Sequence, residues 1–187
     1  MAAEILDEAE VHKSWNRLLR VTVRTAGGAR ISRDVEDHGH AVAVLPYDPV
    51  RRVALLVRQL RVPMLLAQNL AQTLEAPAGI IDSDDPEACG RRELMEEVGT
   101  RVGTLEPVAV AQTMPGISTE TIHLFLAAYS ATDRVAAGGG LEAENEEIDV
   151  VEMALAELAA MADAGRLGDL KTLALVQSLR LRRPELF

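Results

Sequence analysis

Hydrophobic and polar residues alternate in the first quarter of this 187-residue chain, and the alternation predicts a β-hairpin. Residues 17–25 alternate along Arg-Leu-Leu-Arg-Val-Thr-Val-Arg-Thr, residues 27–28 are two glycines that favour a turn, and residues 29–36 lead back. Because an isolated hairpin is marginally stable in water, we expect this one to pack on another surface.

The middle of the chain predicts the centre of a sheet. Residues 40–46 and 52–60 are nearly continuous apolar runs, as expected of strands buried on both faces, and a Tyr-Asp-Pro turn separates them. Further strands are expected at residues 104–113, 121–129 and 149–154.

Helices are expected where capping residues flank periodic segments. One helix is expected at residues 86–98, because Asp85 suits its N-cap and Gly99 suits its C-terminal end. Two more are expected at residues 154–164 and 170–181, on either side of a glycine-containing turn. The order of the elements predicts an α/β fold, arranged as an α/β/α sandwich with a mixed sheet.

Composition and charge narrow the class of protein. Hydrophobic residues make up 48% of the chain, enough for the core of one ordinary domain, and a single cysteine excludes an intramolecular disulfide. The net charge of −10 argues against binding to nucleic acid or to an anionic membrane. The N-terminal sequence lacks the features of a signal peptide, and no apolar run approaches the ~18 residues of a membrane span, so we expect a cytoplasmic protein.

Three glutamates share one side of the helix expected at residues 86–98. On a helix that advances about 100° per residue, Glu93, Glu96 and Glu97 lie within an arc of about 100°. If these side chains are buried about 5 Å apart, each pair costs roughly 3 kcal/mol at an effective dielectric near 20, and a hard divalent cation relieves the repulsion. A solvated acidic face is the alternative, and this short pattern alone favours the alternative.

A longer pattern around the glutamates reverses that preference. Residues 92–99 read Arg-Glu-Leu-Met-Glu-Glu-Val-Gly and follow Gly79, which resembles the Nudix box of hydrolases that cleave nucleoside diphosphates linked to another moiety. The chain has one residue fewer than the family pattern between Gly79 and Arg92. Asp84 or Asp85 also stands in place of the first glutamate of the box. The shortened form is similar to that of the GDP-mannose pyrophosphatase branch.

The resemblance extends over most of the chain. Residues 57–61, Val-Arg-Gln-Leu-Arg, and 74–79, Leu-Glu-Ala-Pro-Ala-Gly, are similar to segments of the ADP-ribose and GDP-mannose pyrophosphatases. The family fold implies a Nudix hydrolase domain at residues 39–187 and a small N-terminal β-hairpin subdomain at residues 1–38. The resemblance also implies a homodimer held together through the N-terminal subdomain.

The resemblance further implies a metal site with Mg²⁺, or alternatively Mn²⁺, and a general base. The acidic residues 142–147 follow three glycines and look like the loop that supplies the base in relatives, where the glycines would let the loop close over substrate. Glu144 is assigned as the base, with its acidic neighbours as alternatives, and Arg92 is expected to orient the box glutamates by ion pairing. The implied catalytic residues are Glu93, Glu97 and Glu144, and the implied metal ligands are Ala78, Glu93, Glu96, Glu97 and Glu146.

Implied substrate contacts come from several segments. Trp15, the only tryptophan, stands where relatives stack an aromatic ring on the base from the partner chain, and a core or interface residue is its alternative. Arg61 suits bidentate phosphate binding, against the alternative of an ordinary edge-strand arginine. Glu120 follows a Pro-Gly turn of the kind associated with ADP-ribose-type substrates, and a solvated turn residue is its alternative. The implied substrate contacts are Trp15, Arg33, Arg61, Gly79, Ile80, Glu120 and Lys171.

Together these features predict a Mg²⁺-dependent enzyme that hydrolyses the pyrophosphate of a nucleoside diphosphate sugar. The products would be a nucleoside monophosphate and a sugar phosphate. The shortened box and Lys171 favour GDP-mannose as the substrate, and ADP-ribose is the alternative. A non-catalytic Nudix-fold sensor of nucleotide sugars is the alternative from another class, which the shortened box allows and the three intact glutamates argue against.

Overall fold

The structure divides into two compact units. One unit combines Met1–His40 with Ala111–Ile122 and is called the β1–β3 unit, and the other combines Ala41–Val110 with His123–Phe187 and is called the main unit. The coordinates are those of a computed structural model, which describes residues 2–81, 85–141 and 146–187.

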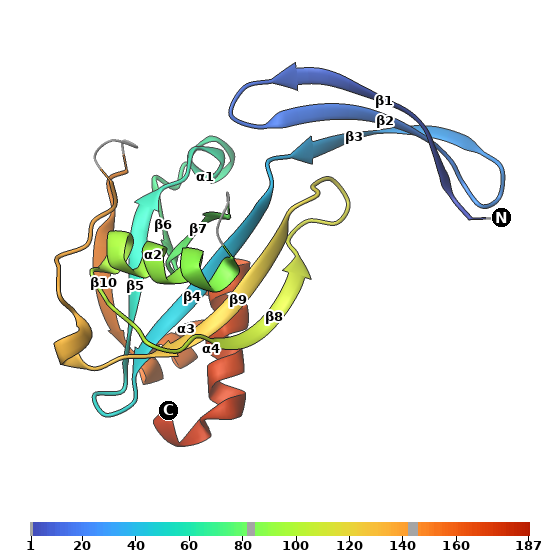
Figure 1. The fold of residues 1–187 in the computed structure, drawn as a ribbon. Coiled ribbons are helices and arrows are strands. Elements are labelled where there is room, and N and C mark those ends of the chain that lie inside the picture. The colour runs from blue at the N-terminus through green and yellow to red at the C-terminus, as the bar shows by residue number, and fades with distance from the viewer. Residues whose placement is uncertain (1, 82–84, 142–145) are drawn as a thin grey trace. The chain divides into compact units, whose positions relative to one another are not determined.

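Three antiparallel strands in the order β1-β2-β3 build the β1–β3 unit (Figure 1). Strand β1 precedes the two strands that the sequence predicted. Among the described residues of these strands only Leu19 and Thr22, both on β2, are buried, so the sheet has almost no core of its own. The strands span Glu4–Lys13 (β1), Arg17–Arg24 (β2) and Arg30–Asp37 (β3).

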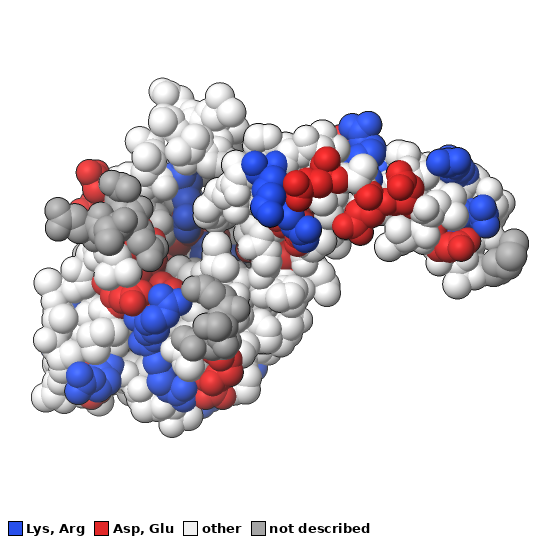
Figure 2. All heavy atoms as spheres, turned by 45° about the horizontal axis from the view of Figure 1, so that its top comes forward, with Lys and Arg blue, Asp and Glu red and all other residues white. Residues whose placement is uncertain are grey.

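Oppositely charged side chains pair across these strands. Arg17 pairs with Asp37, and Arg20 pairs with Asp34, both between β2 and β3. Figure 2 shows acidic and basic side chains side by side along this unit. Because an exposed ion pair contributes only about 0–1 kcal/mol, these pairs favour the strand register more than they stabilise the unit.

A seven-stranded sheet forms the centre of the main unit. Its path is β10-β5-β4-β9-β8, with β6 paired to β5 and β7 paired to β4. Strand β4 is buried from Ala41 to Asp48, as expected from the continuous apolar run there, and the predicted α/β fold with a mixed sheet is confirmed. The strands span His40–Asp48 (β4), Val53–Leu60 (β5), Gln72–Glu75 (β6), Ala78–Ile81 (β7), Glu106–Gln112 (β8), Thr121–Ala128 (β9) and Asp149–Ala154 (β10).

Helices cover both faces of this sheet. Helix α2 crosses one face, and α3 and α4 lie on the other, as Figure 1 shows. No helix in the described part of the chain is long and apolar enough to span a membrane. The helices span Val62–Gln68 (α1), Pro86–Val98 (α2), Leu155–Asp163 (α3) and Leu170–Arg182 (α4), with 3₁₀ turns at Ala131–Asp133 (η1) and Pro184–Leu186 (η3).

Helix α2 has the bounds and caps that the sequence predicted. The Asp85 carboxylate accepts the backbone N–H of Glu87 at 2.9 Å and that of Ala88 at 3.0 Å, and Gly99 ends the helix with a φ of 65°. A Cβ at Gly90 would lie 3.0 Å from a methyl carbon of Val44, so glycine allows the helix to pack closely on the sheet. The buried side of α2 carries Cys89, Leu94 and Val98.

Helix α1 was not expected. It has Pro63 in its first turn and ends at Asn69, which adopts a left-handed conformation with a φ of 54°. None of its described residues is buried, and Leu66 is 88% exposed. Because the segment shows no polar face, its sequence gave no amphipathic helical signal.

Candidate active site

Two glutamates of helix α2 are buried and the third is partly exposed. Glu93 and Glu97 are 9% and 2% exposed, whereas the side chain of Glu96 is 23% exposed. Burial distinguishes this arrangement from the solvated acidic face that was the alternative. The helix therefore carries carboxyl groups into the interior of the main unit, where any charge on them must be compensated.

Glu97 is held beside the start of strand β7. Its Oε2 atom accepts the backbone N–H of Ala78 at 3.1 Å. Burial is the main cause that raises the pKa of Glu97, and the nearby charges of Glu93 and Glu146 act in the same direction. The Ala78 N–H and Arg61 oppose them, and the resulting pKa is about 8. A carboxyl group that resists ionisation in this way favours a bound cation, which would stabilise its charged form.

Glu93 lies against the glycine that begins the Nudix-like pattern. A Cβ at Gly79 would lie 2.1 Å from Oε1 of Glu93, so a larger residue there would force this carboxylate to move. The Arg92 guanidinium lies 2.9 Å from Glu93 Oε1 and 3.0 Å from Glu96 Oε2. Arg92 thus makes the ion pairs with two glutamates of the box that the sequence predicted, and its orienting role stays a prediction.

A glycine segment covers the C-terminal end of α2. The N–H of Gly139 donates to the carbonyl of Glu97 at 2.9 Å, and that of Gly140 donates to the carbonyl of Glu96 at 3.1 Å. Glycine is required at 140, because a Cβ there would lie 2.8 Å from Cβ of Glu146. These glycines were expected to act as a hinge, and the structure shows that they also bind the helix and bring Glu146 toward its carboxylates.

The residues around α2 fit a hard divalent cation in charge and in donor type. Buried carboxylates and backbone carbonyls are oxygen donors of the kind that Mg²⁺ prefers. Within the described ranges, no three His, Cys, Asp or Glu side chains are already grouped as a metal-binding set. Glu144 lies outside the described residues, as does Asp84. The assignment of the metal ligands and of the base stays a prediction.

A second buried carboxylate pairs with two cationic side chains in the main unit. Glu75, whose side chain is 4% exposed, accepts two hydrogen bonds of 2.9 Å from Nε and a terminal nitrogen of Arg61. It also pairs with Lys171, which lies 3.0 Å from Asp169. Burial alone would raise the pKa of Glu75, but the hydrogen bonds from Arg61 and the charge of Lys171 outweigh it and lower the pKa to about 2.

The same cluster joins helix α4 to the segment before β7. Asp169 is the N-cap of α4 and accepts the N–H of Thr172 at 3.0 Å. The hydroxyl of Thr172 in turn accepts the N–H of Ala76 at 2.6 Å. The backbone that leads to Ala78 is therefore fixed from the opposite side of the sheet to α2. Sequence reasoning placed Glu75 and Thr172 within motifs but assigned neither of them a role.

Three of the implied substrate contacts lie in the β1–β3 unit. Trp15 is 74% exposed and stacks on His38, so it is not a core residue of this unit. Glu120 accepts hydrogen bonds from His38 and Thr113. Arg33 is exposed, and its guanidinium donates to the Ser32 carbonyl. Their roles in substrate binding stay predictions.

Comparison with known proteins identifies the family. The NUDIX domain family matches residues 37–176, which include the whole box and Lys171. The chain belongs to the NUDIX family.

Relatives of this Nudix protein are similar over most of their length. The GDP-mannose pyrophosphatase of Cronobacter sakazakii is 42% identical over 154 residues, which are 82% of this chain and 80% of the relative. That of Escherichia coli O157:H7 is 37% identical over 153 residues, 81% and 79% of the two chains. A solved structure described as an ADP compounds hydrolase superposes with a TM-score of 0.78 over 99% of this chain and 96% of the other, and its 19% identity supports the fold alone.

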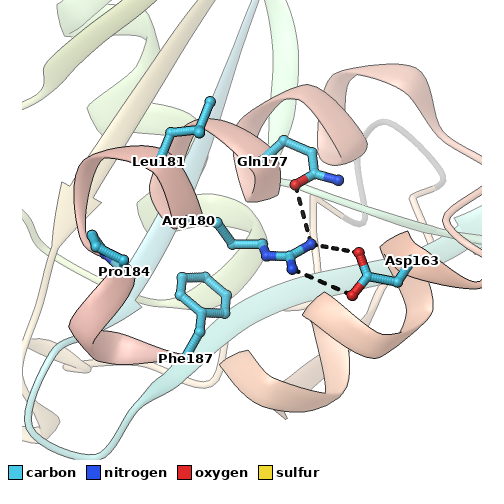
Figure 3. A pocket seen from close by; sticks show the side chains of 6 residues that line it. All are labelled: Asp163, Gln177, Arg180, Leu181, Pro184 and Phe187. Atoms are coloured by element: carbon cyan, nitrogen blue, oxygen red, sulfur yellow. Dashed lines mark hydrogen bonds and ion pairs between the residues drawn. The ribbon is translucent and has the colours of Figure 1, made fainter.

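A hollow of about 450 Å³ lies elsewhere on the main unit. The Arg180 guanidinium is held there by Asp163, with one contact of 2.7 Å, and by Gln177 at 3.2 Å (Figure 3). None of the predicted site residues lines this hollow. Its lining residues are Asp163, Gln177, Arg180, Leu181, Pro184 and Phe187.

Proposed function

We propose that this Nudix protein hydrolyses the pyrophosphate bond of a nucleoside diphosphate sugar, with GDP-mannose as the preferred substrate. The observation that carries the proposal is the buried carboxylate pair of Glu93 and Glu97 on helix α2, beside Gly79 and the Ala78 amide. The similarity to GDP-mannose pyrophosphatases over four fifths of the chain supports the choice of substrate.

The residues proposed to hold a divalent cation surround one end of α2. When bound, Mg²⁺ or Mn²⁺ would neutralise the diphosphate and make a water molecule more acidic. Glu144 is proposed to accept the proton of the attacking water. Attack on phosphorus then releases a nucleoside monophosphate and a sugar phosphate. The proposed ligands are the Ala78 carbonyl, Glu93, Glu96, Glu97 and Glu146.

Two cations of the main unit are proposed to bind the diphosphate. Arg61 is 41% exposed at its side chain although two of its nitrogens are bound to Glu75, so part of its guanidinium stays open to a ligand. Lys171 carries the second positive charge on the same carboxylate. Glu75 thereby keeps two long cationic side chains in fixed positions before substrate arrives, which lowers the entropy cost of binding.

The two alternatives keep specific support. ADP-ribose remains the alternative substrate, because the Pro-Gly turn before Glu120 suits it equally well. A sensor that binds a nucleotide sugar without cleaving it remains the alternative from another class. The burial of Glu93 and Glu97 argues against the sensor, because binding alone gives no reason to bury two like charges.

A homodimer is also proposed, with residues 1–38 as the dimerisation subdomain and 39–187 as the hydrolase domain. The support is the β1–β3 sheet, whose strands bury almost nothing within one chain. A sheet with so little core gains stability when a second surface covers it. Sedimentation equilibrium of the full chain and of a chain that lacks residues 1–38 tests this directly: a full chain that stays monomeric would remove the proposal.

The proposed activity is tested with a panel of nucleotide sugars and product detection, with Mg²⁺ and with EDTA. We expect Mg²⁺-dependent release of GMP and mannose 1-phosphate, and cleavage of GDP-mannose in clear preference to ADP-ribose. Glu97→Gln should lower kcat at least about a hundredfold, while Glu87→Gln, on the exposed first turn of the same helix, should leave kcat unchanged. Binding of GDP-mannose without cleavage would favour the sensor instead.

A further inference from the structure

His38 lies where three segments of the β1–β3 unit meet. It directly follows β3, its ring stacks on the turn between β1 and β2, and its Nε2 atom contacts the segment 111–122. We propose that His38 is a positioning residue that holds Trp15 and Glu120 together as one nucleoside-binding surface. The inference rests on the proposed function, because it takes Trp15 and Glu120 as substrate contacts.

The imidazole ring supports the indole of Trp15. The ring centroids are 5.3 Å apart and the planes are inclined by 24°, which is the geometry of an offset stack. Trp15 is 74% exposed, so apart from this stack most of its surface faces solvent. Asn16 gives the turn a second attachment, because its amide donates to Glu36 Oε1 at 2.9 Å. That bond fixes the backbone of the turn, whereas the stack fixes the indole ring itself.

The edge of the imidazole ring holds Glu120. Nε2 of His38 lies 3.1 Å from Glu120 Oε1, and the Thr113 hydroxyl donates to Glu120 Oε2. Nδ1 is buried and lies 2.8 Å from Glu36 Oε1, but not in the alignment of a hydrogen bond. The hydrogen bond of the His38 ring is therefore the one between Nε2 and Glu120. Each carboxylate oxygen of Glu120 still has a lone pair for a further donor.

The loop that carries Glu120 is attached to the end of β3 as well. The N–H of Glu36 donates to the Ile117 carbonyl at 2.8 Å, and the N–H of Thr119 donates to the Glu36 carbonyl at 3.1 Å. Backbone contacts thus place the loop next to His38, while the Nε2 bond selects the orientation of the Glu120 side chain. His38 joins an aromatic surface and a hydrogen-bond acceptor that come from distant parts of the sequence.

A purine nucleoside has the chemistry that this pair would recognise. Its flat base can stack on an indole, and its base N–H and ribose hydroxyl groups can donate to a carboxylate. Because both protein groups are already fixed, such a ligand binds without first ordering them. Loss of His38 should consequently weaken binding and leave the chemical step unchanged, which separates a positioning residue from a catalytic one.

Three substitutions at His38 separate the effect of its ring stack on Trp15 from the effect of its hydrogen bond to Glu120. Phenylalanine keeps the stacked ring and removes the hydrogen bond to Glu120, glutamine keeps an N–H donor and removes the ring, and alanine removes both. His12→Gln is the matched control, because His12 is an exposed residue of β1. Trp15 is the only tryptophan in the chain, so its fluorescence reports the stack directly.

We measure the Trp15 emission maximum, its quenching by acrylamide, and KM and kcat for GDP-mannose with Mg²⁺. Phenylalanine should retain the wild-type emission and raise KM about threefold, since one hydrogen bond is lost. Glutamine should shift the Trp15 emission to the red and increase its quenching by acrylamide. Alanine should cause the same two changes in the emission and should also raise KM about tenfold. In all three variants kcat should stay within about twofold of wild type.

An alanine variant with wild-type emission and wild-type KM would overturn the proposal, and so would an emission change with no change in KM. A fall in kcat at constant KM would also overturn it, because it would place His38 in the chemical step. If the wild type cleaves no nucleotide sugar, the proposed function fails. The emission measurements still separate the two failures, since they test the link between His38 and Trp15 without substrate.

Discussion

Replacing Glu97 by glutamine should abolish the loss of stability that the metal-free protein shows as the pH rises from 6 to 8.5. Glu97 is 2% exposed, and burial followed by the charge of Glu93 raises its pKa from 4.5 to about 8. The folded protein therefore binds this proton more tightly than the unfolded chain does. The contribution of Glu97 to stability is complete below pH 4.5 and is lost as the pH rises through about 8.

The size of the loss in stability follows from the pKa shift of Glu97. One pKa unit corresponds to about 1.4 kcal/mol, so a rise from 4.5 to about 8 sets an upper limit of about 5 kcal/mol on the loss. The part of this loss that falls between pH 6 and 8.5 is at most about 2.5 kcal/mol. Rearrangement of side chains and entry of water around the carboxylate reduce it, and we expect a loss of about 1–2 kcal/mol over this range. Glutamine stays neutral at every pH, so this part of the slope should disappear in Glu97→Gln.

Urea denaturation in EDTA at several pH values measures this slope. Glu87→Gln is the control, because Glu87 lies on the exposed start of the same helix and pairs with Arg91. Added Mg²⁺ should stabilise the wild type more at pH 8.5 than at pH 6, since the cation binds the ionised carboxylate. A metal-free wild type whose stability is constant or rises over this range, or a Glu97→Gln variant with the wild-type slope, would refute the reasoning.

Three further substitutions test the surroundings of the site. Glu75→Gln leaves the Arg61 guanidinium without its buried carboxylate. Because a buried ion pair is then broken on one side, the free energy of unfolding in urea should fall by about 3 kcal/mol. A loss below about 1 kcal/mol would contradict this. Wild-type stability should also fall as the pH drops from 4.5 toward 2, since the folded-state pKa of Glu75 is lowered to about 2. Gly79→Ala places a methyl group 2.1 Å from a Glu93 oxygen and should lower kcat for GDP-mannose at least about tenfold, and unchanged turnover would show that this carboxylate can move freely. Asp85→Ala removes the N-cap of α2 and should lower the melting temperature by an amount equivalent to about 1 kcal/mol, whereas Asp85→Asn should retain most of the cap.

Local signals in the sequence predicted the elements that surround the site. Helix α2 was predictable at both ends, because an aspartate N-cap and a C-terminal glycine act on neighbouring backbone groups. Strand β4 was predictable because burial on both faces leaves a continuous apolar run. Strand β1 was missed because half of its sequence, EILDEAEVHK, is charged and none of its residues is buried. Helix α1 was missed for another reason, because its apolar residues form no one-sided stripe and none of them is buried.

Long-range contacts were beyond sequence reasoning even where the motif was recognised. Glu75 and Lys171 are 96 positions apart, and His38 and Glu120 are 82 positions apart, so no local spacing relates them. The sequence marked Arg61 and Lys171 as cations suited to phosphate. It did not indicate that one buried carboxylate binds both, because that depends on how β6 and α4 pack in the folded main unit.

The charges around the site explain why a cation is needed for an anionic substrate. In the described part of the main unit, three cations face six carboxyl groups around α2 and Glu75. Glu97 stays protonated below its pKa of about 8, but the other five still outnumber the cations, so these surroundings repel a diphosphate rather than attract it. The cations are Arg61, Arg92 and Lys171, and the carboxyl groups are those of Glu75, Glu93, Glu96, Glu97, Glu146 and Asp169. The net charge of −10 adds a weaker repulsion from the rest of the chain. One divalent cation offsets two of these negative charges and also binds phosphate oxygens, so metal and substrate should each strengthen the binding of the other. We therefore expect the same excess of carboxylates that opposes the substrate in EDTA to make hydrolysis dependent on the metal.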